Sequence, residues 1–148
     1  MHKLVLFLYR IFYKMDRLKI PFLPNLLNKL FIRLLFGCQI GLGAKLGKNI
    51  LLGYGGLGCV IHHRAVIGDN VNIGSNVTIG GTSKIKEVPV IGNNCIISTG
   101  AKIIGPITIG ENSVIGANAV VISNIPANSL VVGIPARVVK SNINIEDY

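Results

Sequence analysis

The chain has 148 residues, half of them hydrophobic, with a net charge of +9 and no tryptophan. This length and hydrophobic content suit one domain with a real core, so they exclude a disordered polypeptide and require no second domain. The three cysteines, Cys38, Cys59 and Cys95, are odd in number and lack a CxxC spacing. We therefore expect reduced, structural thiols in a cytoplasmic protein.

Residues 1–36 are predicted to form a basic amphipathic helical segment. They hold seven basic residues against one acidic residue and so account for +6 of the net charge. A first helix is expected over residues 1–20 and is broken by Pro21 and Pro24, and a second is expected from Asn25 to Phe36, ending at Gly37. Basic residues recur on one side of the first helix: Lys3, Arg10, Lys14 and Arg17.

Two roles for this segment stay open. It can cap the mouth of the following domain or pack on a neighbouring subunit, or it can anchor the protein at the anionic inner face of a membrane. Charges interrupt every apolar run before the roughly 20 residues that a membrane span needs, and a signal-peptide cleavage site is missing. Nucleic acid is not expected as a partner, because no motif of that kind is present.

A six-residue period dominates the chain from residue 61 onward. This period is neither helical nor alternating, and it is typical of a coil with three short flat faces that each point one bulky residue inward. We therefore predict an all-β fold, a parallel β-helix of about five coils over residues 37–140, followed by a polar tail over 141–148. The first hexad positions are Ile61, Ile67, Ile73, Ile79, Ile85, Ile91, Ile97, Ile103, Ile109, Ile115 and Val121. Small or branched residues fill the fifth positions: Ala65, Val71, Val77, Cys95, Ala101, Ser113 and Ala119.

Two segments interrupt the repeat and are the candidates for site structure. Earlier hexads begin at Ile40, Leu46 and Leu52, and the phase then slips by three within the glycine-rich stretch 54–60. Such an insertion must bulge out of the coil. The second interruption is the polar stretch 80–89, in which Ile85 keeps the hexad phase only by chance.

The isoleucine-glycine hexads, the Gly80-Gly81-Thr82 loop and the ending 133–140 together resemble the hexapeptide-repeat acyltransferases, in particular a short serine-acetyltransferase-like branch. The resemblance covers residues 37–140, and its most specific stretch is 52–62. It implies a left-handed β-helix, assembly as a homotrimer, and acetyl-CoA bound in the groove between neighbouring subunits.

Two departures from that family bear on the acceptor. Serine acetyltransferases carry an aspartate and a histidine that act as the base pair, and Gln39 and Tyr54 stand at those places here. The loop 81–89 also lacks the family's histidine. We therefore expect an O-acetyltransferase acting on a sugar hydroxyl of a surface polysaccharide. Serine is the alternative acceptor, and a non-catalytic β-helix scaffold is the alternative of another class.

Transfer of an acetyl group to a hydroxyl needs a base for the hydroxyl proton and donors for the developing oxyanion. Imidazole is the natural base, and the choice falls on His62, with His63 as the second candidate. Successive strand residues point to opposite sides, so both rings serve one site only if a corner turns between them. An orienting partner is left open among Glu87, Asp69 and a backbone carbonyl.

The remaining site residues are assigned more coarsely. Tyr54 either donates a hydrogen bond to the acceptor or packs over the bulge, and the amides of Gly80 and Gly81 are candidates for the oxyanion or the pantetheine arm. The resemblance carries over further acetyl-CoA positions: Thr99, Ala117, Ser123, Arg137 and Lys140. The last two also suit the phosphates of CoA. A metal is not expected, because zinc in γ-carbonic anhydrases needs three histidines and adjacent His62 and His63 give poor ligand geometry.

Overall fold

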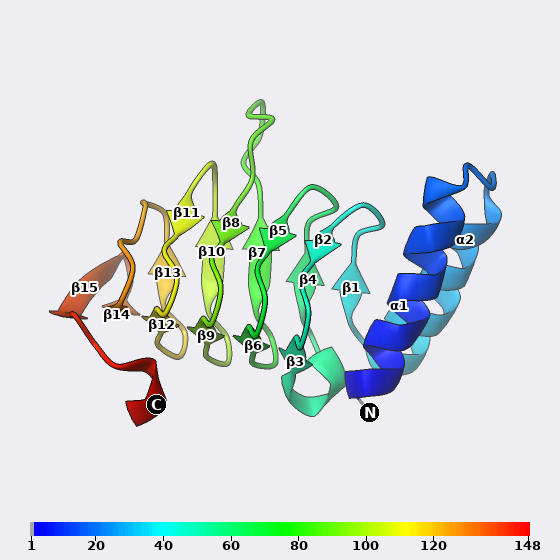
Figure 1. The fold of residues 1–148 in the computed structure, drawn as a ribbon. Helices are drawn as coiled ribbons and strands as arrows, with labels where there is room; N and C mark the ends of the chain where they lie inside the picture. Colours follow the sequence, from blue (N-terminus) through cyan, green and yellow to red (C-terminus); the bar gives the residue numbers. More distant parts are fainter. Residues whose placement is uncertain (1) are drawn as a thin grey trace.

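The computed structural model describes residues 2–148 and shows a parallel β-helix closed at one end by helices (Figure 1). Its strands stack into three sheets, one for each face of the coil. Sheet A contains β1 (Gln39–Ile40), β4 (Val60–Ile61), β7 (Thr78–Gly80), β10 (Lys102–Ile104) and β13 (Val120–Val121). Sheet B contains β2 (Lys45–Leu46), β5 (Val66–Ile67), β8 (Val90–Ile91) and β11 (Thr108–Ile109). Sheet C contains β3 (Leu51–Leu52), β6 (Asn72–Ile73), β9 (Ile96–Ile97), β12 (Val114–Ile115), β14 (Ser129–Gly133) and β15 (Ala136–Ser141).

The number of coils is smaller than predicted. Four coils carry a strand on each of the three faces, and a fifth is incomplete. In that fifth coil a single bridge between Ile109 and Ile125 stands in for a strand of sheet B. The solenoid then ends in an antiparallel hairpin of β14 and β15, which the six-residue period did not predict.

The hexad residues form the core, as the period predicts. Ten of the eleven first-position residues between 61 and 121 are buried, and the small fifth-position residues are buried beside them. Ile85 is the exception, since 43% of its surface is exposed in the loop between β7 and β8. It therefore keeps the phase of the repeat without belonging to the core.

A ladder of asparagine side chains runs along the corner between sheets B and C. The Nδ2 atom of each asparagine donates to the Oδ1 atom of the next at 3.0–3.1 Å, through Asn49, Asn70, Asn94, Asn112 and Asn128. Each of these residues has a positive φ between 52° and 57°, a conformation that asparagine tolerates better than other non-glycine residues. The ladder thus both turns the chain and ties successive coils together.

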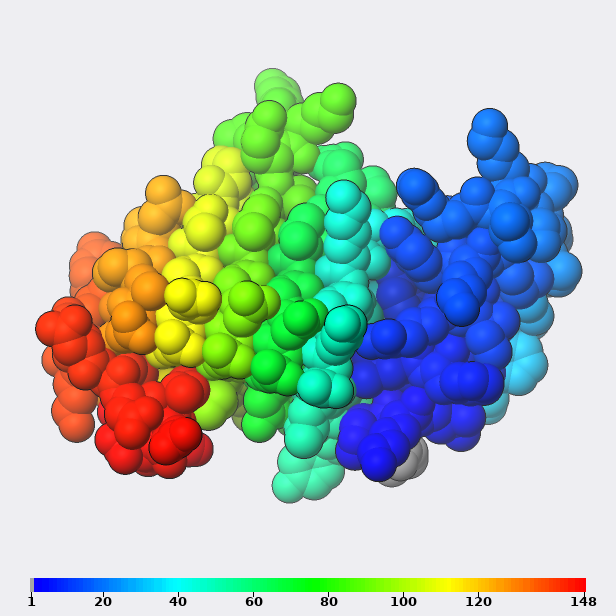
Figure 2. All heavy atoms as spheres, in the orientation of Figure 1, coloured from blue at the N-terminus to red at the C-terminus, as the bar shows by residue number. Residues whose placement is uncertain are grey.

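The N-terminal helices close the mouth of the first coil, as Figures 1 and 2 show. Helix α1 spans His2–Arg17, and α2 (Leu23–Leu27) continues into a π-helical stretch, η1 (Asn28–Leu35). The second helix begins two residues earlier than predicted, because Pro24 is accepted within the first turn. Gly37 ends it with a φ of 62°.

Apolar side chains and two buried polar contacts hold this cap on the coil. Val5, Tyr9, Phe12 and Ile32 are buried in the same cluster as the solenoid core. The Tyr9 hydroxyl donates to the Ala44 carbonyl at 2.8 Å, and Asn28 Nδ2 donates to the Ile40 carbonyl at 2.9 Å. Within residues 2–148, no helix is long and apolar enough to cross a membrane.

All three cysteines lie in the described part of the chain, as buried free thiols. Cys95 occupies a fifth hexad position, and its Sγ atom donates to the Gly110 carbonyl at 3.3 Å. Burial raises the pKa of the Cys38 thiol to about 12, with a smaller contribution from Cys59. These thiols are therefore protonated core residues and not nucleophiles.

Candidate active site

His62 and His63 lie at the corner where the chain leaves β4 of sheet A for β5 of sheet B. The His62 amide donates to the Ile79 carbonyl at 2.9 Å, which fixes this corner beside the end of β7. The two ring centroids are 4.3 Å apart and the ring planes are inclined by 31°. The corner therefore turns between the two residues, and their rings lie against each other instead of on opposite sides of a strand.

The environment of His62 favours the neutral form of its ring. Partial burial, with smaller contributions from His63 and the Arg64 guanidinium, lowers the pKa of His62 below its usual value. The ring is half-buried, and its Nδ1 atom accepts the Arg64 amide hydrogen at 3.1 Å. In the neutral ring this places the proton on Nε2. A proton can therefore enter at Nδ1 only if the Arg64 amide hydrogen bond breaks, and Nε2 becomes the basic atom only if the ring proton first moves to Nδ1.

Neither predicted carboxylate orients His62 in the single chain. Asp69 lies on the corner between sheets B and C. There its Oδ1 atom accepts the amide hydrogen of Lys48, in the preceding coil, at 2.7 Å. Glu87 is exposed in the loop after β7. Among residues 2–148, no group of three histidine, cysteine or acidic side chains is arranged to hold a metal ion.

The glycine pair and Ser123 share the histidine edge. Gly80 ends β7, one strand beyond His62, and its carbonyl accepts the Gly105 amide hydrogen at 3.0 Å. Gly81 starts the loop that projects from the solenoid in Figure 1. Ser123 follows β13 on the same edge, three strand spacings from His62, or about 14 Å. An extended ligand lying along the solenoid could therefore contact all of them.

Tyr54, Thr99 and Ala117 lie on a different edge, the corner between sheets C and A. Tyr54 is 81% exposed in the bulge formed by the short helix η2 (Gly53–Gly56), where its φ is 51°. The bulge and the loop after β7 project from opposite sides of the coil (Figure 1). The width of sheet A thus separates Tyr54 from His62 within one chain. Arg137 and Lys140 are exposed on β15, where Arg137 pairs with Val132 and Lys140 with Leu130 of β14.

A hollow of about 490 Å³ opens beside the bulge, and sequence reasoning did not foresee it. Its lining comes from the second helix, β1 and β4: Arg33, Gly37, Cys38, Gln39, Gly58, Cys59 and Val60. The Gln39 Oε1 atom is buried there without a hydrogen-bond partner among the described residues. Gln39 was singled out because it stands at the place of the aspartate of serine acetyltransferases, but only the packing of the helical cap brings Arg33 to the same hollow.

Comparisons with known proteins agree with the fold and with the repeat. Residues 89–123 match the family of bacterial transferase hexapeptides (six repeats), and residues 64–104 match the hexapeptide repeat of succinyl-transferase. A serine acetyltransferase of Synechococcus elongatus is 40% identical over 131 residues, covering 86% of this chain and 53% of the relative. A serine acetyltransferase of Staphylococcus aureus is 46% identical over 112 residues, covering 74% of this chain and 52% of the relative.

Solved structures of the same group superpose on nearly the whole chain. The serine acetyltransferase of Neisseria gonorrhoeae has a TM-score of 0.89 at 33% identity, covering 95% of this chain and 55% of that one. Soybean serine acetyltransferase complexed with serine has a TM-score of 0.87 at 37% identity, covering 92% and 56%. The present chain spans about half the length of the relatives it matches.

Proposed function

The chain is a hexapeptide-repeat protein of the serine acetyltransferase-like branch, and on this premise we propose that it is an acetyl-CoA-dependent O-acetyltransferase. The main support for the proposal is the corner between β4 and β5 that holds His62 and His63. A half-buried imidazole with a lowered pKa stands one strand away from a pair of glycines, at the root of a projecting loop. A neutral imidazole beside backbone amides is what acyl transfer to a hydroxyl requires.

In the proposed mechanism, His62 takes the proton of the acceptor hydroxyl as the oxygen attacks the thioester carbonyl. The Gly81 amide stabilises the oxyanion of the tetrahedral intermediate, because the Gly80 amide is already paired with β10 in sheet A. When that intermediate collapses, the C–S bond breaks and the imidazolium returns the proton to the CoA thiolate. His63 supports the ring of His62 by packing against it. No acyl-enzyme forms on this route.

We propose that the complete site forms between copies of the chain in a homotrimer. The candidate residues divide between two edges of the solenoid, with the histidines, Gly80, Gly81 and Ser123 on one edge and Tyr54, Thr99 and Ala117 on the other. If the histidine edge of one copy lies against the Tyr54 edge of its neighbour, the two groups of residues come together. Arg137 and Lys140 would then supply cations for the phosphates of CoA.

We favour serine as the acceptor over a sugar hydroxyl. The sequence had favoured a sugar, because Gln39 and Tyr54 replace the aspartate and histidine of serine acetyltransferases. The similarity to serine acetyltransferases, one of them solved in complex with serine, supports this choice. The hollow beside the bulge adds a physical reason, because Arg33 offers a cation for an amino-acid carboxylate. A neutral sugar has no group that needs Arg33.

The test is release of CoA from acetyl-CoA in the presence of L-serine or of candidate sugars. We expect turnover with L-serine and little with sugars. Turnover with a sugar alone would restore the polysaccharide assignment. If the wild-type chain neither binds CoA nor releases it, the chain is a scaffold that kept the fold without the chemistry. We place the reaction in the cytoplasm, where buried free thiols persist.

A further inference from the structure

Helix α1 presents two apolar faces, and only one of them packs on the solenoid. Val5, Tyr9 and Phe12 form the buried face. On the opposite side, Leu4, Phe7 and Ile11 follow one another at helical spacing along one stripe, and Leu18, one residue beyond the end of α1, continues it. This outer stripe is open to solvent, with Phe7 60% and Leu18 75% exposed. The need to cap the coil therefore does not explain these residues.

The second helix extends the exposed apolar surface. Its leucines at spacings of three and four residues are also exposed: Leu23, Leu26, Leu30 and Leu34. Together with the outer stripe of α1 they form what we call the outer helical surface. Exposed apolar side chains that gather on two contacting helices mark a site that contacts another molecule or a membrane.

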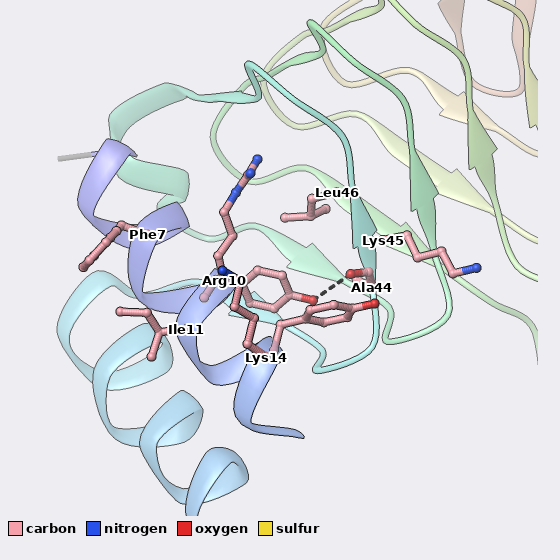
Figure 3. Close-up of a pocket in the computed structure, with 9 residues that line it drawn as sticks. Phe7, Arg10, Ile11, Lys14, Ala44, Lys45 and Leu46 are labelled. Atoms are coloured by element: carbon pink, nitrogen blue, oxygen red, sulfur yellow. Dashed lines mark hydrogen bonds between the residues drawn. The ribbon is translucent and has the colours of Figure 1, made fainter. Parts of the chain in front are cut away.

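Basic side chains border the outer helical surface. Lys3, Arg10, Lys14 and Arg17 are all exposed along the adjacent side of α1. Between α1 and the first coil lies a cavity of about 470 Å³, at whose edge Arg10, Lys14 and Lys45 add three cations to an apolar and aromatic lining. Figure 3 shows Arg10 and Lys14 coming from the helix, with Lys45 on the strand opposite. Among the described residues, none that lines this cavity is acidic.

The positive charge of the outer helical surface favours an anionic partner. The segment 1–36 carries seven basic residues and one acidic residue, so two copies that met through these helices would repel each other. An anionic bilayer surface attracts the same cations and also accepts exposed leucine and phenylalanine side chains at its boundary. The outer helical surface combines both features on helices that do not span a membrane.

We propose that the outer helical surface docks the protein onto an anionic phospholipid bilayer. Phe7, Ile11 and Leu18 enter the boundary between headgroups and acyl chains, and lipid phosphates contact Arg10, Lys14 and Lys45 at the edge of the cavity. The docking surface covers the exposed side of α1 and reaches Lys45 on β2 at the edge of the cavity. It is independent of the proposed acetyl transfer, and either proposal can fail without the other.

The test is flotation of the full chain with vesicles of phosphatidylcholine, with and without phosphatidylglycerol. We expect binding at least tenfold tighter to the anionic vesicles, weakened by high salt. Phe7→Ser/Ile11→Ser and Lys14→Glu/Lys45→Glu should each lower this binding at least tenfold. Exposed positions elsewhere provide matched controls: Ile134→Ser on the β14–β15 hairpin and Lys86→Glu in the loop after β7 should bind like the wild type.

Circular dichroism and the thermal midpoint identify any variant that fails to fold, and light scattering without lipid gives the mass of the assembly. The Phe7→Ser/Ile11→Ser variant should keep the wild-type mass. A lower mass would show that the outer helical surface is an interface between copies and would overturn the proposal. Equal binding to neutral and anionic vesicles, or no binding to either, would also overturn it.

Discussion

The rings of His62 and His63 lie with their centroids 4.3 Å apart, and the Arg64 amide donates to Nδ1 of the first of them. Three consecutive residues at one corner thus set both the position and the protonation state of the proposed base. The electrostatic effects of His63 and of the Arg64 guanidinium both help to lower the pKa of His62. The corner favours a neutral imidazole, the form that accepts a proton.

The pH dependence of the reaction should reflect this environment. Because burial, His63 and Arg64 lower the pKa of His62, kcat/KM should rise with pH through a midpoint below the ordinary imidazole value of about 6.5. In Arg64→Ala the midpoint should move up toward that value, since one neighbouring cation is gone. The measurement is kcat/KM for CoA release as a function of pH, with Lys86→Ala as the control. A wild-type midpoint above the ordinary value would contradict the assignment.

Arg33 should affect acceptor binding more than turnover. In Arg33→Ala, we expect KM for L-serine to rise at least tenfold, because a charged hydrogen bond to the carboxylate contributes about 1.5–3 kcal/mol, while KM for acetyl-CoA stays unchanged. Steady-state kinetics with each substrate varied in turn separates the two. The exposed Arg17→Ala is the matched control, as it lies outside the hollow. Equal changes in both KM values would place serine elsewhere.

The hexad phase alone does not decide which isoleucines hold the coil together. Ile79→Ala should lower the free energy of unfolding by about 2–5 kcal/mol, because the side chain is fully buried between coils. Ile85→Ala, in the same hexad phase but exposed in the loop, should change it by less than about 0.5 kcal/mol. Urea denaturation followed by circular dichroism measures both. Similar losses in the two variants would mean that Ile85 packs in the core after all.

The asparagine ladder should contribute to stability at its centre. Asn94→Ala removes the hydrogen bonds to Asn70 and Asn112 and places alanine at a φ of 55°, so we expect a loss of about 2–4 kcal/mol in the free energy of unfolding. Asn94→Gly loses the same hydrogen bonds without the backbone strain and should lose about 1 kcal/mol less than alanine. Chemical denaturation distinguishes them. An alanine variant as stable as the wild type would show that the ladder does not contribute to the free energy of unfolding.

Much of the fold could be predicted because each hexad corresponds to one of the three faces of a coil. Each inward isoleucine and each small fifth residue has one place in a coil, so Ile67 and Ala65 are assigned by position alone. The ladder also has a signal in the sequence, since asparagine recurs at the fourth place of several hexads. The β14–β15 hairpin lies beyond the repeat, where the period carries no information.

The candidate site was predicted less well, because it depends on contacts between distant segments. His62 and Gly80 could be paired through the register of neighbouring coils. That His62 and His63 stack depends on the turn at one corner, and that Arg33 reaches Gln39 depends on how the helical cap packs. The division of the site residues between two edges required the sheet topology.

The most direct test compares CoA release from acetyl-CoA and L-serine by the wild type, His62→Asn and His63→Asn under saturating substrate. We expect His62→Asn to lower kcat at least 100-fold, within the range for loss of a general base, and His63→Asn to lower it less than tenfold. A His62→Asn variant that keeps the wild-type kcat would contradict this expectation.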